Sequence, residues 1–234
     1  MGKPKTHSRY IGLLVVDKPI GLSSMDVVRR VRRAAGFAKT GHAGTLDPLA
    51  TGVVICCLGA ATKAIDRLMA TTKVYDTVID LSAFTTTDDR EGDREEVAVD
   101  TPPSRGEIDA AVTRFVGEID QTPPAYSAVH VAGQRAYKLA RSGRAVAIEP
   151  RRVRIDAVEV RGYAFPELSL RITCGKGVYI RSLGRDLGRT LGTGGHLASL
   201  RRTAVGRHTL HDAVPIERLD EPITQDDLLP VPGA

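Results

Sequence analysis

Tryptophan is absent from this sequence of 234 residues, and aromatic residues make up only 4% of it. There are three cysteines, Cys56, Cys57 and Cys174, and they form no CxxC pair. The histidines also lack the spacing of metal ligands. These absences argue against a disulfide scaffold and a zinc site. We therefore expect no metal, and we expect the cysteines to be reduced and buried in the core of a cytosolic protein.

Several other sequence signatures are missing. No apolar run reaches membrane length, and the first residues, MGKPKTHSRYIG, contain no apolar signal-peptide core. This predicts a soluble cytoplasmic protein with no membrane partner. The phosphate-loop pattern GxxxxGK[ST], the dinucleotide pattern GxGxxG and the hydrolase elbow GxSxG do not occur. We therefore expect no cofactor, so that any chemistry must come from the side chains.

The charge of the chain is weakly positive. Lys and Arg number 33 against 28 for Asp and Glu, which gives a net charge of +5. Arginines gather in three places along the chain: Arg29, Arg30, Arg32 and Arg33; Arg151, Arg152 and Arg154; Arg201 and Arg202. Such clusters either follow the phosphates of a polyanionic partner or belong to solvated faces.

Apolar periodicity predicts intermingled helices and strands. We expect helices after a cap at Ser23 or Ser24, with Met25, Val27, Val28 and Val31 on the apolar side, and over 60–70, 104–116 (capped by Ser104) and 177–192. Strands are expected over 11–17, 52–58, 73–85, and as an antiparallel pair over 151–162 and 167–174. The stretch TTTDDREGDREE (85–96) is predicted to be a polar connection, too charged to pack. Without a regular βαβ repeat, the pattern indicates an α+β fold with a mixed, mostly antiparallel sheet.

The loop GHAGTLDPLATGVV (41–54) contains a single carboxylate, Asp47, and leads into the apolar strand 52–58. Asp before Pro is common in turns, where its side chain bonds the backbone, so a purely structural role is one interpretation. The other is a nucleophile or base in chemistry that needs neither a metal nor a cofactor. A glycosidase would need two carboxylates, and this loop has one.

Six unusual stretches occur in order: LLVVDKPIGLSSMDVV (13–28), GHAGTLDPLATGVV (41–54), LSAFTTTDDREG (81–92), QTPPAYSAVHVAGQRAYKLARSG (121–143), CGKGVYIRSLGRDLG (174–188) and GGHLASLRRTAVG (194–206). This series resembles the TruB family of tRNA pseudouridine synthases. The resemblance implies the pseudouridine synthase fold, with flanking helices and a central RNA-binding cleft. It also implies isomerisation of one T-loop uridine (conventional position 55) to pseudouridine, without a metal or cofactor. In this reaction the glycosidic bond breaks, the flipped base turns, and a C–C bond forms.

The resemblance also implies roles for individual residues. Asp47 matches the catalytic aspartate of the family, and Arg181 matches its active-site arginine. Tyr75 matches the tyrosine that stacks on the target base, and His42 matches the histidine that fills the place in the RNA stack which the base has left. Two further pocket positions match, Tyr179 and Leu200, which would equally suit the core. Lys18 and Pro19 match a motif that braces the active-site loop.

The implied partner is the T stem-loop of tRNA, with no guide RNA and no obligatory protein partner. Two alternatives use the same surface. One is a chaperone for tRNA folding in which catalysis is secondary, and the other is the catalytic subunit of a guide-RNA particle, whose long basic extensions this sequence lacks. We expect a catalytic domain over 1–212 and a Pro- and Asp-rich tail over 213–234 that is thin in core residues. The small RNA-binding domain of the PUA type that family members carry at the C-terminus is expected to be absent or truncated.

Overall fold

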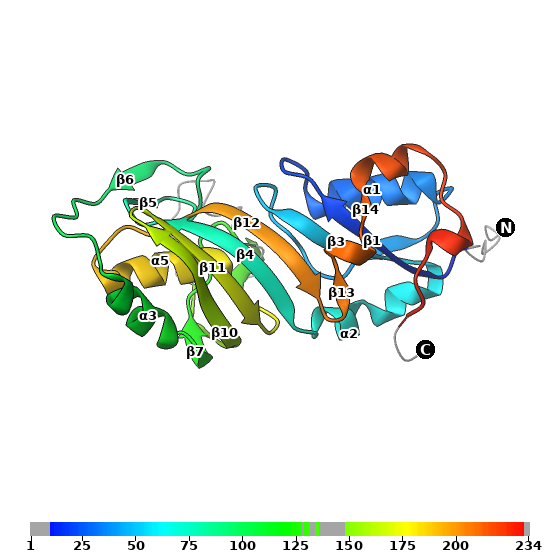
Figure 1. Ribbon diagram of the computed structural model, residues 1–234. Helices are drawn as coiled ribbons and strands as arrows, with labels where there is room; N and C mark the ends of the chain where they lie inside the picture. The colour runs from blue at the N-terminus through cyan, green and yellow to red at the C-terminus, as the bar shows by residue number, and fades with distance from the viewer. Residues whose placement is uncertain (1–9, 128, 132–133, 136–147, 232–234) are drawn as a thin grey trace. The chain divides into compact units, whose positions relative to one another are not determined.

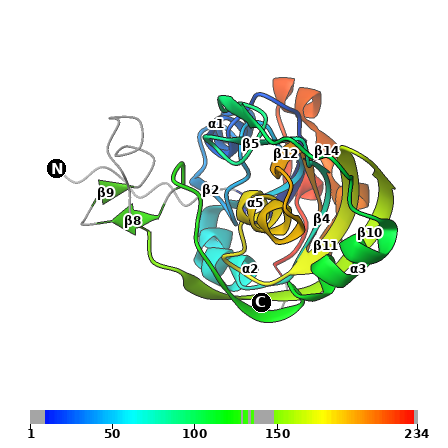
Figure 2. The ribbon, with the colours of Figure 1, turned by 90° about the vertical axis from the view of Figure 1, so that its left-hand side faces the viewer.

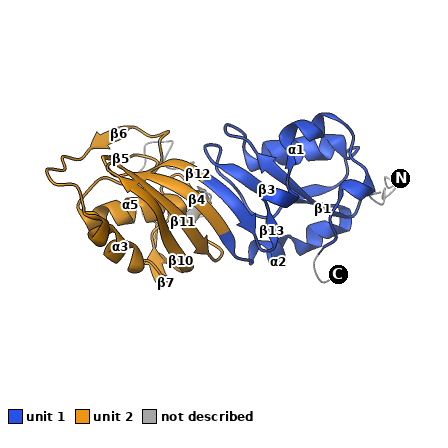
Figure 3. Cartoon of the chain, in the orientation of Figure 1, with its two compact units in different colours: residues 1–73, 201–234 blue, residues 74–200 orange. Residues whose placement is uncertain are grey.

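The computed structural model describes residues 10–127, 129–131, 134–135 and 148–231 (Figure 1). Part of the 121–143 motif therefore lies outside the described residues. The chain forms two compact units, which are residues 1–73 with 201–234 and residues 74–200 (Figure 3). The chain leaves the first unit at the start of strand β4 (Lys73–Asp80) and returns to it within strand β12 (His196–Val205).

The first unit is built around strands β1 and β3. Its elements in chain order are β1 (Gly12–Lys18), α1 (Ser24–Ala34), β2 (Thr40–His42), β3 (Thr51–Leu58), the 3₁₀ helix η1 (Gly59–Ala64), α2 (Ile65–Met69), β13 (His208–Thr209), η2 (Leu210–Asp212), β14 (Val214–Pro215), η3 (Ile216–Asp220) and η4 (Gln225–Asp227). β1 pairs antiparallel with one edge of β3. The other edge of β3 pairs with β2 and with the end of β12, where Arg202 lies opposite Gly52. The Asp47 loop thus joins β2 to the start of β3, beside β12.

Burial in this unit follows the sequence pattern. Apart from Asp17 and Lys18 at the end of β1, strands β1 and β3 are mostly apolar on both faces, and both faces are buried. Helix α1 begins with a capping box between Ser23 and Asp26, and it buries Val27, Val28 and Val31. Met25, which we placed on the apolar side of this helix, is instead 50% exposed.

The C-terminal segment is packed against the same sheet. Ile216, Leu219, Ile223 and Leu228 are buried, so the prediction of a segment thin in core residues is wrong. The main chain of Leu229 exchanges two hydrogen bonds of 2.8 Å with Leu13 on β1. These apolar residues are spaced among prolines and acids, which hides them from a helix or strand template. The division at residue 212 stays a prediction, although both sides of it belong to the same compact unit.

The described residues of the second unit form a curved sheet and two helices. Its elements are β4, β5 (Ala83–Thr85), β6 (Arg94–Glu96), α3 (Arg105–Thr113), β7 (Gly117–Gln121), β8 (His130–Val131), β9 (Gln134–Arg135), β10 (Arg151–Ala164), β11 (Glu167–Cys174), α5 (Ile180–Leu191) and the first half of β12. The strand order is β12-β4-β11-β10-β7. β4, β11 and β10 curve past α5 (Figure 2). Gly184 brings α5 close to Ile79 of β4 and Leu197 of β12.

The structure confirms an α+β fold with a mostly antiparallel mixed sheet. It also confirms the antiparallel pair β10–β11 and the Ser104 cap of α3, which is a capping box with Glu107. The single strand predicted over 73–85 is wrong. Asp80 accepts hydrogen bonds from the backbone N–H and the hydroxyl of Ser82, and the resulting turn separates β4 from β5. The helix predicted over 60–70 is divided into η1 and α2.

Candidate active site

Asp47 lies on the loop between β2 and β3, and it is partly exposed. Side chains of the first unit hold this loop by hydrogen bonds to its main chain. Ser24, at the start of α1, accepts from the Leu46 N–H at 2.8 Å and donates to the Leu46 carbonyl at 3.1 Å. The fully buried Lys18 donates from Nζ to the Pro48 carbonyl at 3.3 Å, which agrees with the bracing role expected of it. The loop that presents Asp47 is therefore anchored on both sides of this residue.

His42 ends β2, five residues before Asp47. Burial lowers the pKa of its imidazole, and the positive charge of Arg202 lowers this pKa further. Its Nδ1 atom is buried and has no hydrogen-bond partner among the described residues. The neutral form of His42 is therefore favoured at neutral pH, and a neutral ring suits the stacking role that the resemblance implies.

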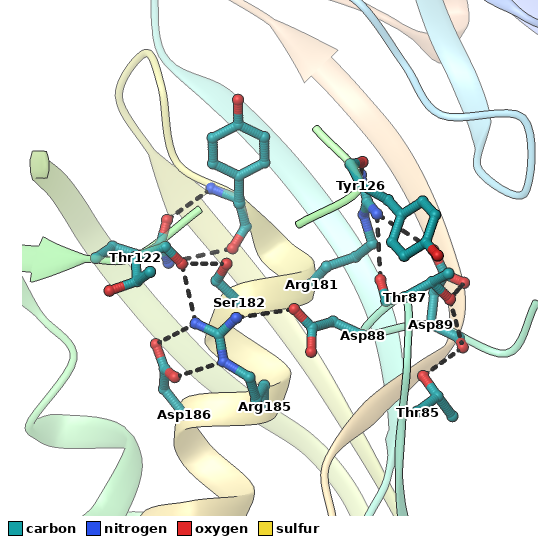
Figure 4. Close-up of polar contacts among 12 residues, drawn as sticks. Thr85, Thr87, Asp88, Asp89, Thr122, Tyr126, Arg181, Ser182, Arg185 and Asp186 are labelled. Atoms are coloured by element: carbon teal, nitrogen blue, oxygen red, sulfur yellow. Dashed lines mark hydrogen bonds and ion pairs between the residues drawn. The ribbon is translucent and has the colours of Figure 1, made fainter. Parts of the chain in front are cut away.

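Arg181 is the buried polar centre of the second unit (Figure 4). It lies in the first turn of α5, and its guanidinium donates to the carbonyls of Thr87 at 3.2 Å and Tyr126 at 3.1 Å. Its Nη1 atom lies 3.6 Å from a carboxylate oxygen of Asp89. Both side chains are almost inaccessible, at 7% and 4% exposure. The contacts fix the direction of the guanidinium and leave it little rotational freedom.

A second arginine, one helical turn later, extends this network (Figure 4). Arg185 donates to Asp88 at 2.8 Å, to Asp186 at 2.9 Å and to the Thr122 carbonyl at 2.9 Å. Burial raises the pKa of Asp88, although Arg185 and Arg181 beside it act in the opposite direction. Asp88 also has a positive φ of 60°. The prediction that the 85–96 stretch is too charged to pack is therefore wrong for its central part, because Asp88 and Asp89 form ion pairs with arginines of α5.

The other predicted pocket residues also lie in the second unit. Tyr75 is half-buried on β4, and Tyr179 is half-buried at the N-cap of α5. The main chain of Tyr179 exchanges two hydrogen bonds with the amide of Gln121, at 2.8 and 3.1 Å. Leu200 is buried on β12, with 6% exposure. Of the six predicted site residues, Asp47 and His42 thus belong to the first unit and the other four to the second.

The arginine clusters differ in their exposure. The four arginines of α1 are exposed, and Arg29 pairs with Asp26. Arg201 pairs with Asp17 at 2.7 Å, whereas Arg202 is 2% exposed and donates only to main-chain carbonyls among the contacts of the described residues. The interpretation of Arg202 as part of a phosphate-binding track is therefore wrong.

The cysteines are free and buried, as predicted, and burial raises the pKa of Cys57 to about 11. Among the described residues, no three His, Cys, Asp or Glu side chains are grouped so that they could hold a metal ion. None of the helices in the described ranges combines the length and the apolar composition needed to cross a membrane.

Comparison with known proteins connects both units to one family. Residues 32–180 match the model of the TruB family pseudouridylate synthase N-terminal domain, and residues 181–229 match that of the tRNA pseudouridylate synthase B C-terminal domain. The chain is 51% identical over 220 residues to tRNA pseudouridine synthase B of Mycobacterium sp. (strain KMS), covering 90% of this chain and 73% of that protein. It is 46% identical over 216 residues to the protein of the same name from Thermobifida fusca, covering 89% and 74%.

Solved structures agree with this match. A Cbf5–Nop10–Gar1 complex contains a chain that is 26% identical, with a TM-score of 0.69, over 94% of this chain and 56% of that one. An H/ACA RNP bound to a substrate RNA containing 2′-deoxyuridine contains a chain that is 25% identical, with a TM-score of 0.67, over 94% and 55%. These likenesses and the family models confirm the resemblance and the expected fold.

Proposed function

Because the chain belongs to the TruB family of pseudouridylate synthases and is an isomerase that converts uridine to pseudouridine in tRNA, we propose that its target lies in the T loop, at conventional position 55, and that Asp47 is its catalytic carboxylate. The observation that carries this proposal is the setting of Asp47. It is the only acid of the 41–54 loop, and this loop is anchored from within the unit by Ser24 and the buried Lys18. An RNA-binding cleft is part of the same proposal.

In this proposal, Asp47 acts as a nucleophile or a base. It attacks the ribose, adds to the base or removes a ribose proton, and all three paths need one ionised carboxylate held against a flipped uridine. Arg181 supplies fixed N–H donors, because the carbonyls of Thr87 and Tyr126 and the carboxylate of Asp89 set its orientation. Because the guanidinium of Arg181 is already oriented, it needs little reorganisation to donate to a negatively charged group of the reacting complex.

The remaining residues hold the RNA. Tyr75 offers a flat face and a polar tip, which suit a uracil that must be held and still turn in place. His42 fills the gap that the flipped base leaves in the stack, and Tyr179 and Leu200 form the walls of the pocket. Unstacking a base costs a few kcal/mol, and contacts between exposed arginines and phosphates offset this cost.

The chain acts on tRNA without a guide RNA or an obligatory protein partner. The two solved structures reported above are complexes, but the relatives that are about half identical are named tRNA pseudouridine synthase B. The purified chain should therefore form pseudouridine in a bare T-arm stem-loop. Activity that appears only after a guide RNA or another protein is added would contradict this part of the proposal.

Substitution Asp47→Asn tests the catalytic role. We expect the variant to bind tRNA within about threefold of the unmodified chain and to lose more than about 99% of its single-turnover rate, a loss of about 3 kcal/mol or more. Asp66→Asn, the same change at an exposed carboxylate of α2, is the matched control and should keep the full rate. Retention of over one percent of the rate by Asp47→Asn would refute the role. If the chain served chiefly as a chaperone, the substitution would leave its main activity, tRNA folding, intact.

A further inference from the structure

Arg202 is the largest fully buried side chain described in the structure. The hydrogen bonds that its guanidinium donates within the described residues go to main-chain carbonyls of the 41–54 loop. Its Nε atom donates to the Val53 carbonyl at 2.7 Å. Its Nη1 atom donates to the Thr45 carbonyl at 3.2 Å, and its Nη2 atom donates to the Gly44 carbonyl at 3.2 Å. Two of these carbonyls precede Asp47 and one follows it. The two ends of the loop are thus tied to one rigid group within the first unit.

We propose that Arg202 is a positioning residue that fixes the Asp47 loop in its reactive geometry. This inference rests on the proposed function, in which Asp47 is catalytic. The planar guanidinium directs its N–H groups in fixed directions, so three carbonyls bound to it keep a fixed separation. A lysine ammonium is a point donor on a flexible stem, and it would not hold the three carbonyls in the same arrangement.

The loop sequence is fitted to this arginine. Gly44, which accepts from Nη2, has a φ of +111°, a conformation that L side chains rarely adopt. Gly52, at the start of β3, has a φ of +105°, and a Cβ atom there would lie 2.2 Å from the carbonyl oxygen of Arg202. The side chain of Arg202 therefore fixes the path of the loop, while its main chain lies directly against the strand that follows. Two of the glycines in GHAGTLDPLATG are needed for this arrangement.

The stability of the fold alone does not explain why an arginine occupies this buried position. A buried charge must be fully hydrogen-bonded to be tolerated, and an apolar residue of similar volume often packs as well. Catalytic groups, by contrast, must be held within about 0.5 Å of their productive geometry by neighbours whose own positions are fixed. Arg202 meets that need, because its three acceptors lie in the segments on either side of Asp47.

Substitution Arg202→Lys tests the inference, because it keeps the charge and removes the fork of donors. We expect the single-turnover rate at saturating T-arm stem-loop to fall about 100-fold, since a displacement of about 1 Å costs roughly that factor. The dissociation constant for tRNA should stay within about threefold. Arg218→Lys is the matched control. Arg218 is in the same unit, and its Nη2 atom donates to both carboxylate oxygens of Asp227, at 3.0 and 3.1 Å. The control should therefore keep the full rate.

The outcomes separate positioning from a general loss of stability. A destabilised but correctly arranged protein would melt at a lower temperature, while its folded fraction kept the full saturating rate, and that result would overturn the inference. A loss of tRNA affinity with an unchanged saturating rate would also overturn it. If Arg202→Lys does not fold, Gly44→Ala decides instead. It strains the same loop and keeps the Arg202 side chain, with the added Cβ atom 3.7 Å from Nη1. It should lower the saturating rate at least tenfold, whereas a full rate would again refute the inference.

Asp47→Asn, measured in parallel, keeps this inference distinct from the proposed function. If Asp47→Asn is inactive and Arg202→Lys is fully active, only the positioning role fails. If Asp47→Asn is active, the proposed function fails, and the positioning role fails with it.

Discussion

Removal of the Asp89 carboxylate should destabilise the protein far more than its place in a charged stretch suggests. Asp89 lies 3.6 Å from Arg181, and both side chains are buried. Its carboxylate also accepts from the Thr87 hydroxyl at 2.6 Å and from the Glu91 N–H at 3.0 Å. Asp89→Ala deletes all three interactions and leaves a buried guanidinium without this carboxylate.

The magnitude follows from burial. Breaking a buried ion pair by removing one partner costs about 3–5 kcal/mol. We expect the lower end, about 3 kcal/mol, because 3.6 Å exceeds the usual length of a charge-assisted hydrogen bond and because Arg181 keeps its carbonyl partners at Thr87 and Tyr126. Asp89→Asn keeps an acceptor oxygen and should cost less, about 1–2 kcal/mol.

Urea unfolding at pH 7 measures these losses. Asp109→Ala is the matched control, because Asp109 forms an exposed ion pair with Arg105 in the same unit, where both side chains are about half exposed. This control should change the free energy of unfolding by less than about 1 kcal/mol. If Asp89→Ala costs no more than Asp109→Ala, the pair with Arg181 does not stabilise the fold, and our account of the network is wrong.

Two further predictions concern titration and RNA binding. The pKa of His42 is lowered from 6.5 in the folded state. As the pH falls below 6.5, the unfolded state therefore takes up the proton first, and the protein loses stability. His42→Asn should remove this part of the pH dependence. Urea unfolding at pH 7.5 and 5.5 measures it, and equal losses in both proteins would contradict the shift. The logarithm of the tRNA binding constant should fall linearly with the logarithm of the salt concentration. The double substitution Arg32→Gln and Arg33→Gln on α1 should lower the slope of this line by about one for each phosphate that the variant no longer binds. The control Arg105→Gln should leave the slope unchanged. A slope that all these substitutions leave unchanged would place the α1 arginines on a solvated face.

The parts of the fold that the sequence predicted are those whose signals are local. The Ser104 cap and Glu107 stand three residues apart, so the capping box of α3 is visible in four letters. The β10–β11 pair follows from two alternating runs joined by a short turn. The two β-strands at the centre of the first unit follow from apolar runs of strand length.

The acids of the 85–96 stretch were mispredicted because their partners are distant in sequence. Asp88 and Asp89 carry no local sign of burial, and a stretch so rich in charge is usually solvated. Their partners, Arg181 and Arg185, come about ninety residues later, and they project from one face of α5 because they are four residues apart. The helix gave no local signal either, because Arg181 and Arg185 each lie two residues from Leu183 and so do not share the leucine face of α5.

Arg202 shows how strand alternation separates two neighbouring arginines. We grouped Arg201 and Arg202 as one basic cluster, but adjacent residues of a strand point to opposite faces. Leu200 and Arg202 therefore share a face of β12, and both are buried, while Arg201 lies on the other face and pairs with Asp17. Once residues 196–205 are known to form a strand, the apolar Leu200 predicts that Arg202 points inward. An inward guanidinium must then find carbonyl or carboxylate acceptors, and the 41–54 loop supplies the main-chain carbonyls of Gly44, Thr45 and Val53.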